Sequence, residues 1–227
     1  MDIIWHGQAC FEIRIPSNQA EKKTIVIDPF SAEIGLKLPS LTADIVLVSH
    51  DHSDHNNAKA IKGKPFIIDG PGEYEVKGVF IQGVSALHPV RNKISNGASG
   101  SFQKKELGQT TIYTLEADGI RFCHLGDLNQ KELIPEQLEV IGEVDILMVP
   151  VGGTYTINGE GAQKIVNQIE PKIVIPMHYK LPKLKIKLDE VEKFLKAMGQ
   201  EEIEPQSSLK IKKQGLPTET KIVVLKA

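Results

Sequence analysis

Short apolar or alternating stretches separated by turn residues dominate the first half of the chain, and such stretches favour β-strands. We expect strands over residues 2–6, 10–15, 23–28, 44–48, 65–69 and 79–87. A helix is expected over residues 54–62, with Gly63 as its stop signal. Residues 91–107 break the pattern with a polar, Gly- and Ser-rich segment, which predicts a long loop that is either mobile or gates a pocket.

The second half repeats this order of strands before helices. Its apolar stretches predict strands over residues 109–116, 120–125, 145–151, 172–176, 208–213 and 221–226. Helical spacing predicts helices over residues 134–142, 159–169 and 188–198. The pattern therefore indicates one α+β domain spanning residues 1–227, with two pseudo-equivalent halves at about 1–107 and 108–227. Two β-rich layers would pack together, with helices outside them.

Composition and charge narrow the classes of protein to which the chain can belong. Hydrophobic residues make up 41% and charged residues 25%, as in ordinary globular proteins, and the net charge of −2 creates no field that attracts nucleic acid. The N-terminus lacks the basic region of a signal peptide, and no apolar run is long enough to span a membrane. Cys10 and Cys123 lie inside strand-like runs, so we expect buried free thiols. These features predict a cytoplasmic protein.

The most concentrated chemistry follows the predicted strand 44–48. His50, His52, Asp54 and His55 place three imidazoles and a carboxylate in one six-residue window, although the whole chain has only seven His. Neutral imidazole and carboxylate are ligands that zinc, manganese and iron accept. The His-x-His-x-Asp-His motif therefore predicts a metal site at the carboxyl end of a strand, where open α/β sheets place their chemistry.

Three further residues share this position at the end of an apolar strand: His88, Asp127 and His178. Taken alone, each is more often an ordinary loop or core residue than a metal ligand. Their common placement, together with a motif that cannot complete a metal site alone, makes them candidates for the remaining ligands.

The order of these residues resembles that of the metallo-β-lactamase-fold hydrolases over essentially the whole chain. The resemblance implies a four-layer αββα sandwich with a dinuclear site at one edge. It implies that His50, His52 and His88 bind the first ion, that Asp54, His55 and His178 bind the second, and that Asp127 bridges them. The cofactor would then be two divalent ions, with zinc first and manganese or iron as alternatives.

Within that superfamily the chain resembles a small bacterial branch that includes the ascorbate-6-phosphate lactonase and the N-acyl-phosphatidylethanolamine phospholipase D types. The resemblance lies in Trp5-His6-Gly7, Ile27-Asp28-Pro29-Phe30, His124-Leu125-Gly126-Asp127 and Pro176-Met177-His178-Tyr179. A His often occupies the position of Gln8 in this branch, and this difference weakens any transfer of substrate from a relative. Partner loops often complete pockets there, which leaves a homo-oligomer open.

The chemistry that this resemblance implies is hydrolysis by a hydroxide held between two metal ions. Asp54 would accept the proton of the attacking water, and His6 could donate a proton to the leaving group. Asp28 and His124 could orient metal ligands from behind. The alternatives are an Asp-Pro turn for Asp28 and hydrogen-bonded core histidines for His6 and His124.

Two further candidates concern the substrate. Gly153, in a paired-glycine stretch, could form a pocket edge or a simple strand-to-helix turn. Lys180, with Lys183, Lys185 and Lys187 and with Arg91 and Lys93, could form a basic rim for an anionic substrate, although solvated lysines are the simpler interpretation.

The function expected is a metal-dependent hydrolase of a small ester, lactone or phosphodiester. A nuclease of the same fold is an alternative, but the chain has no basic-aromatic stretch for nucleic acid, and aromatic residues make up only 5%. A non-catalytic metal-binding scaffold is the third hypothesis. Degenerate members of the superfamily usually lose ligands, and all seven candidate ligands are present in this chain.

Overall fold

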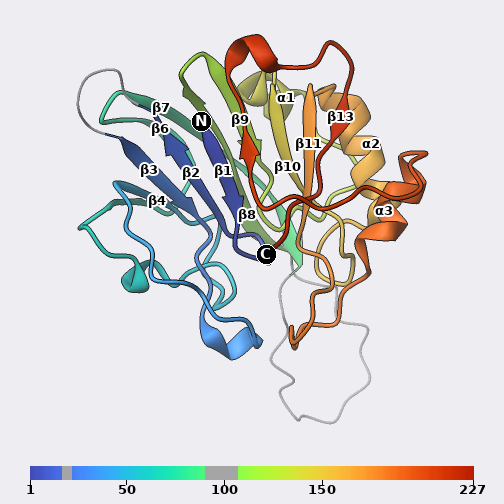
Figure 1. Ribbon diagram of the computed structural model, residues 1–227, viewed down its shortest axis with the longest axis horizontal. Helices are drawn as coiled ribbons and strands as arrows, with labels where there is room; N and C mark the ends of the chain where they lie inside the picture. The colour runs from blue at the N-terminus through green and yellow to red at the C-terminus, as the bar shows by residue number, and fades with distance from the viewer. Residues whose placement is uncertain (17–21, 90–106) are drawn as a thin grey trace.

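The computed structural model describes residues 1–16, 22–89 and 107–227, and these form two β-sheets that pack face to face (Figure 1). The first sheet has the order β12 (Leu209–Lys210), β1 (Asp2–Trp5), β2 (Phe11–Ile15), β3 (Lys23–Ile27), β4 (Ile45–Leu47), β5 (Phe66–Ile68). The second has the order β13 (Lys221–Ile222), β11 (Ile173–Met177), β10 (Ile146–Pro150), β9 (Ile120–His124), β8 (Leu107–Ala117), β7 (Val79–Pro89), β6 (Gly72–Val76). Each sheet is mixed, because antiparallel hairpins join a block of parallel strands.

Alternation along the strands of the first sheet divides its side chains between two apolar clusters. In β3, Ile25 and Ile27 pack into the large cluster between the sheets, whereas Val26 packs into a smaller cluster on the outer face. The same division holds in β4, where Val46 faces outward. Burial on both faces explains why these strands have continuous apolar sequences, which are typical of covered sheets.

The outer faces of the two sheets are covered differently. The second sheet carries the three α-helices, of which α1 contacts β7, α2 contacts β10 and α3 packs on α2 (Figure 1). Their bounds are α1 (Pro135–Ile141), α2 (Gly159–Ile169) and α3 (Val191–Ala197). The outer cluster of the first sheet lies under loops and two short 3₁₀ turns, η1 (Ala32–Ile34) and η2 (Ala58–Ala60). A further 3₁₀ turn, η3 (Lys213–Gly215), precedes β13.

The α+β sandwich and most of the expected strands are confirmed, but the helix expected over residues 54–62 is wrong. After one turn, in which the His55 and Asn56 amides donate to the His52 carbonyl, the Asn57 amide donates instead to Pro29 at 2.7 Å. Tertiary contacts therefore override the local pattern here, and only the short turn η2 remains.

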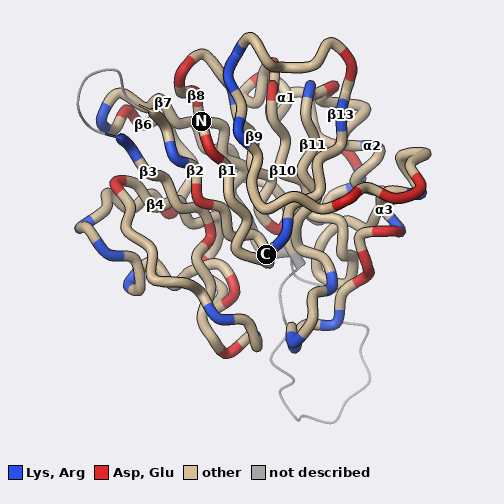
Figure 2. The backbone as a smooth tube through the Cα atoms, viewed as in Figure 1, with Lys and Arg blue, Asp and Glu red and all other residues tan. Residues whose placement is uncertain are grey.

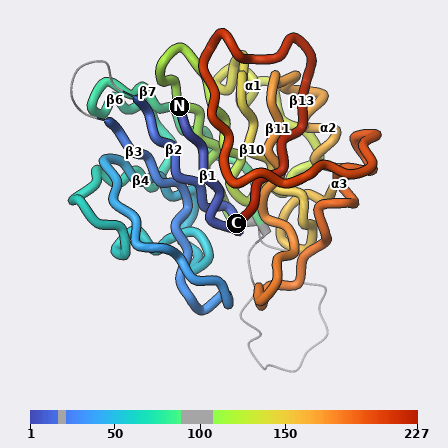
Figure 3. The backbone as a smooth tube through the Cα atoms, in the orientation of Figure 1, coloured from blue at the N-terminus to red at the C-terminus, as the bar shows by residue number. Residues whose placement is uncertain are grey.

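Two other differences lie at the sheet edges. Strand β6 was not expected, because its sequence Gly-Glu-Tyr-Glu-Val is polar and largely exposed at an edge. The expected strands 208–213 and 221–226 shrink to the two-residue ladders β12 and β13. The C-terminal segment nevertheless returns to pair β12 with β1, and the chain ends near the opposite end of β1 from the N-terminus (Figure 3).

The sheets exchange strands across the boundary near residue 107. Strands β6 and β7 precede it and belong to the second sheet, whereas β12 follows it and joins the first. The pseudo-equivalence of two halves stays a prediction. Over the ranges that the structure describes, no helix is long and apolar enough to cross a membrane.

Candidate metal centre

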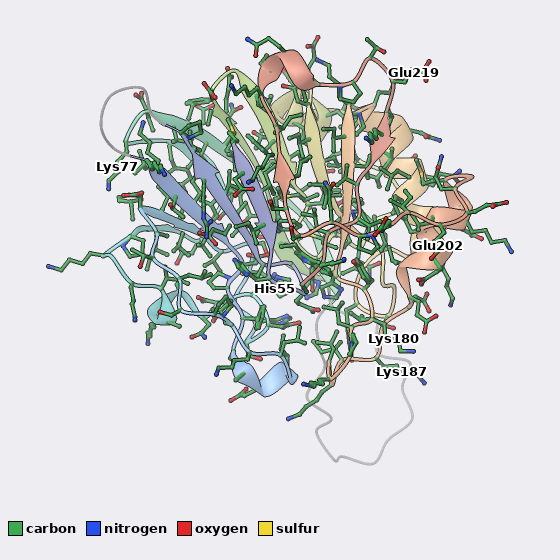
Figure 4. The ribbon with its side chains drawn as sticks, viewed as in Figure 1. His55, Lys77, Lys180, Lys187, Glu202 and Glu219 are labelled. Atoms are coloured by element: carbon green, nitrogen blue, oxygen red, sulfur yellow. The ribbon has the colours of Figure 1, made fainter. Side chains whose placement is uncertain are left out.

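The candidate ligands meet at one edge of the sandwich because they leave the same ends of several strands. The loop after β4 carries His50, His52, Asp54 and His55, and Figure 4 shows His55 at the lower end of the two sheets. In the second sheet β7, β9 and β11 run in one direction, so His88, Asp127 and His178 reach this same edge. The structure thus brings together residues that the sequence places at the ends of separate strands.

Three imidazoles form the first group, which consists of His50, His52 and His88. Nε2 of His50 lies 2.9 Å from Nδ1 of His52, and Nε2 of His88 lies 3.3 Å from that same atom. His50 and His88 are buried, whereas His52 is partly exposed. The group therefore presents three ring nitrogens to one point and has one side open to solvent.

Two carboxylates and two imidazoles form the second group, which consists of Asp54, His55, Asp127 and His178. Oδ1 of Asp127 lies 3.1 Å from Nε2 of His55 and 3.3 Å from Nε2 of His178. All four side chains are buried, and their ligand atoms lie within 4.8 Å of one another. This group is both more acidic and more enclosed than the first.

Asp127 lies between the two groups. While Oδ1 faces His55 and His178, Oδ2 lies 3.8 Å from Nε2 of His50 and 4.0 Å from Nδ1 of His88. The His50 and His55 rings also lie side by side, with centroids 4.3 Å apart. One carboxylate thus faces both groups, which is the arrangement that a bridging ligand requires.

Asp28 lies behind the ligands, fully buried, and fixes two of them. Its Oδ2 accepts a hydrogen bond from Nδ1 of His55 at 2.8 Å and another from the Ser49 hydroxyl at 2.7 Å. Since that hydroxyl donates to Asp28, its oxygen accepts from Nδ1 of His50 at 3.0 Å. Both rings therefore point Nδ1 at an acceptor and direct Nε2 to the side where it can bind a metal ion. This role of Ser49 was not predicted from the sequence, although its position next to the His-x-His-x-Asp-His motif could have indicated it.

The other predicted supporting residue, His124, braces backbone rather than ligands. Its Nε2 donates to the Ala9 carbonyl at 2.9 Å, and its Nδ1 accepts from the Gly126 amide at 3.2 Å. Burial lowers the pKa of this ring, so it is neutral, as these two bonds require. It holds the turn before Asp127, where a Cβ on Gly126 would lie 2.4 Å from Oγ1 of Thr110. The core-histidine interpretation therefore describes His124 better than direct support of Asp127.

The electrostatics of the site suit a metal ion. Burial lowers the pKa of His50, His88 and His178, which favours the neutral rings that bind metals. Burial opposes ionisation of Asp127, yet the neighbouring His178 and His55 rings hold its pKa well below the usual range. Burial alone would lower the pKa of His55, but the Asp127 and Asp28 carboxylates raise it well above its ordinary value.

Buried polar atoms without hydrogen bonds test whether these residues fit an ion. Among the described residues, Nε2 of His55, Nε2 of His178 and Oδ1 of Asp127 have no hydrogen-bond partner, although all three are buried. Leaving a buried polar atom unbonded costs about 1–3 kcal/mol. Three such atoms converging on one point fit a divalent cation, which would bind all of them.

His6 and Lys180 lie outside both groups and line a neighbouring cleft of about 870 Å³, together with Trp5 and Tyr179. Nε2 of His6 lies 3.1 Å from Oε2 of Glu12, so this ring is bound to a carboxylate of the adjacent strand. Lys180 forms an exposed ion pair with Glu190 at 2.6 Å. Tyr179, which follows His178 in the chain, lines this cleft, whereas none of the seven candidate ligands does.

The paired glycines Gly152 and Gly153 lie beside the candidate ligand His178, but Gly152 rather than Gly153 makes the close approach to it. A Cβ on Gly152 would lie 2.1 Å from the His178 carbonyl oxygen, whereas one on Gly153 would meet Oδ2 of Asp189 at 3.3 Å. Gly153 has a φ of +62°, so it serves the turn. Substrate binding at Gly153 stays a prediction.

The lysines of the predicted basic rim fit the simpler interpretation, in which they are solvated. Lys183, Lys185 and Lys187 are exposed, while the intervening Leu184 and Ile186 pack against the outer cluster of the first sheet. Figure 4 labels Lys180 and Lys187 at the lower right of the molecule, where Figure 2 shows basic residues along the loop that follows β11. Arg91, Lys93 and most of the predicted gating loop 91–107 lie outside the described residues.

Comparisons with known proteins identify similar sequences and similar structures. The sequence model of the β-lactamase superfamily domain matches residues 2–178. A UPF0173 metal-dependent hydrolase from Thermoplasma volcanium is 31% identical, over 78% of this chain and 82% of its own length. A crystal structure from Thermotoga maritima, assigned as a Zn-dependent hydrolase of the metallo-β-lactamase superfamily, is 38% identical with a TM-score of 0.75, and the match covers 99% of this chain and 97% of that one. A metal-dependent hydrolase assigned in Parabacteroides distasonis, 21% identical with a TM-score of 0.61 over 99% and 93% of the two chains, shares the fold.

Proposed function

This chain belongs to the metallo-β-lactamase superfamily as a metal-dependent hydrolase, and from that premise we propose that it uses two divalent ions to hydrolyse a small anionic ester, lactone or phosphodiester. His50, His52 and His88 would hold one ion, and Asp54, His55 and His178 the other, with Asp127 between them. The observation that carries this proposal is the convergence of seven ligand-type side chains from four strand ends into two adjacent groups.

Zinc is the first metal to test, because the relative from Thermotoga maritima is assigned as Zn-dependent. Manganese and iron remain alternatives, since imidazole and carboxylate suit all three. When bound, two such ions supply a hydroxide at neutral pH, with the pKa of water lowered to about 7, and polarise the carbonyl or phosphoryl group under attack.

The chain's own residues supply position and proton transfer. Asp28 holds the rings of His55 and, through Ser49, of His50 in the orientation that directs Nε2 to the side where it can bind a metal ion. Asp54, whose carboxylate lies 3.7 Å from Nε2 of His55, is the proposed acceptor of the water proton. Burial of the second group keeps bulk water away from these charges, which strengthens their interactions.

The cleft lined by His6 and Lys180 supports a small anionic substrate. Its volume of about 870 Å³ lies within the usual range for ligand sites, and Trp5, Tyr179 and Leu181 supply apolar contacts. Four lysines line it against two glutamates. A small organic acid or phosphorylated ester presents the matching combination of an apolar body and a negative charge.

The first experiment measures metal content per chain by elemental analysis, on protein purified without chelator or nickel. About two ions per chain, together with hydrolysis in a screen of lactones, esters and phosphodiesters, is the expected result. Chelation should abolish the activity and the reconstituting metal should restore it. Protein that binds no ion even after reconstitution, or that hydrolyses its substrate equally well without metal, would overturn the proposal.

A further inference from the structure

Gln8 is a buried residue beside the second group of ligands to which no role has been given so far. It lies in the turn between β1 and β2 with no exposed surface. Its Nε2 donates a hydrogen bond to Oδ2 of Asp54 at 3.1 Å. The acceptor fixes the orientation of the amide, because turning the Gln8 oxygen toward an ionised carboxylate would place two acceptors against each other.

The backbone of Gln8 reaches a second ligand. Its carbonyl accepts from the His178 amide at 2.9 Å and from the Trp5 indole at 3.0 Å. Asp54 follows a strand of the first sheet and His178 follows a strand of the second. Gln8 therefore ties together two candidate ligands of one ion that come from opposite sheets.

Both ends of this backbone contact have unusual conformations. Gln8 has a φ of +53° and His178 a φ of +54°, in the left-handed region that residues other than glycine rarely adopt. Such conformations persist only where surrounding contacts hold them, and they cluster at functional sites. Here the hydrogen bond between the two residues is one of those contacts.

The second polar atom of the amide argues against a role in packing alone. Oε1 of Gln8 is buried and, among the described residues, has no hydrogen-bond partner. An apolar side chain of the same length would fill this space without leaving a polar atom unbonded. The feature that distinguishes glutamine here is the hydrogen bond to Asp54.

We propose that Gln8 is a positioning residue for the ion held by Asp54, His55, Asp127 and His178, because it orients the Asp54 carboxylate and fixes the backbone of His178. This inference rests on the proposed function, since it concerns the same metal centre. Groups that orient ligands from behind typically contribute 10- to 100-fold to metal affinity. Loss of the amide should therefore weaken one of two binding steps and leave the step at His50, His52 and His88 nearly unchanged.

The test is a titration of chelator-stripped full-length protein with zinc alone, in competition with a zinc indicator, so that both binding steps are resolved. Gln8→Met keeps the length of the side chain and removes the donor. Gln163→Met is the matched control, because the half-buried Gln163 donates to the Ala197 carbonyl between α2 and α3, away from the ligands. We expect one binding step to be about 10- to 100-fold weaker in Gln8→Met, and both steps to lie within twofold of wild type in the control.

Each outcome decides between the two proposals. Wild-type protein that takes up fewer than two zinc ions would overturn the dinuclear function and this inference with it. Two ions in the wild type, with both steps unchanged or equally weakened in Gln8→Met, would overturn the inference alone. If Gln8→Met does not fold, Gln8→Asn tolerates the left-handed backbone but is too short to reach Asp54, and it should weaken the same single step.

Discussion

Two buried aspartates of the second sheet, Asp127 and Asp145, lie at opposite ends of its parallel strands and have opposite surroundings. Asp145 precedes β10 and accepts from Lys172 at 2.9 Å, from Lys213 at 2.8 Å and from the Arg121 amide at 3.0 Å. Asp127 follows β9 and faces His55 and His178, with one oxygen left without a hydrogen bond among the described residues. Lysines therefore surround one carboxylate, whereas histidine rings face the other.

This difference separates a structural charge from a functional one. A buried carboxylate costs free energy unless it is paired, and the lysines near Asp145 meet that requirement within the chain. Around Asp127 this need for a charged partner is met only in part, because its neighbours are imidazoles, which are themselves ligands for a metal cation. The edge of the sheet at which the charges remain incompletely paired is therefore where a bound ion and chemistry belong.

The largest expected effect comes from Asp127→Ala. Hydrolysis should fall about 10³-fold or more, because the two-ion arrangement supplies several kcal/mol of transition-state stabilisation and about 1.4 kcal/mol is tenfold in rate. Steady-state kinetics and metal analysis on the folded variant measure this loss, with Asp145→Asn as the control that should keep its turnover. Full activity in a folded Asp127→Ala protein would contradict the assignment of Asp127 as a functional charge and Asp145 as a structural one. His50→Ala and Asp54→Ala should behave as Asp127→Ala does.

The next effect comes from Asp28→Asn. The amide oxygen can still accept one hydrogen bond, but the charge that holds Nδ1 of His55 and the Ser49 hydroxyl is gone. We expect zinc affinity and kcat/KM to fall about 10- to 100-fold, and because the new amide NH2 would face a buried donor, the metal-free protein should also unfold at a lower temperature. Calorimetric zinc titration and thermal unfolding separate these outcomes. Unchanged affinity would mean that Asp28 belongs with Asp145 as a structural charge.

Asp145→Asn should reduce stability rather than chemistry. It removes two ion pairs with half-exposed lysines and keeps the acceptor for the Arg121 amide, so we expect a loss of about 1 kcal/mol in the free energy of unfolding. Although burial opposes it, hydrogen bonding by Lys213, Arg121 and Lys172 lowers the pKa of Asp145. Because the pKa of Asp145 is lower in the folded state than in the unfolded state, the ionised carboxylate stabilises the fold at pH values above the unfolded pKa of about 3.9. This stabilisation is lost as the pH falls below that value.

Urea unfolding at pH 7 and at pH 3 measures this effect. The difference between wild type and Asp145→Asn should shrink at the lower pH, where the carboxyl of the unfolded wild type is largely protonated. A difference that grows on acidification has the wrong sign for a lowered pKa and would contradict the assignment.

The smallest effect is expected from Lys180→Ala. Lys180 lines the proposed substrate cleft but is exposed and paired with Glu190, so an anionic substrate should gain little from it. We expect KM to rise about two- to fivefold with kcat unchanged, and the effect should diminish in high salt. Lys187→Ala is the control, because Lys187 is equally exposed and does not line the cleft. Equal changes in both variants would assign Lys180 to the general surface.

The sequence predicted the parts of this fold that depend on local pattern. Alternation and apolar runs gave β2, β3 and β10 to within a residue or so, because burial of one or both faces leaves that signal in the sequence. The same logic failed at residues 54–62, where turn contacts to Pro29 replaced a helix. It also missed β6, whose edge position needs no apolar face.

The sequence by itself determined the ligand types and the strand ends that carry them, because a metal ion demands imidazole and carboxylate whatever the surrounding fold. The family resemblance also implied how those ligands divide into two groups, but only the tertiary structure decided why Asp127 faces both and that Ser49 and Gln8 stand behind them. These relations join residues from opposite sheets, and the separation of the residues along the sequence does not reveal them. Strand order and the packing of the two sheets fix them, and both arise from burial of the whole core at once.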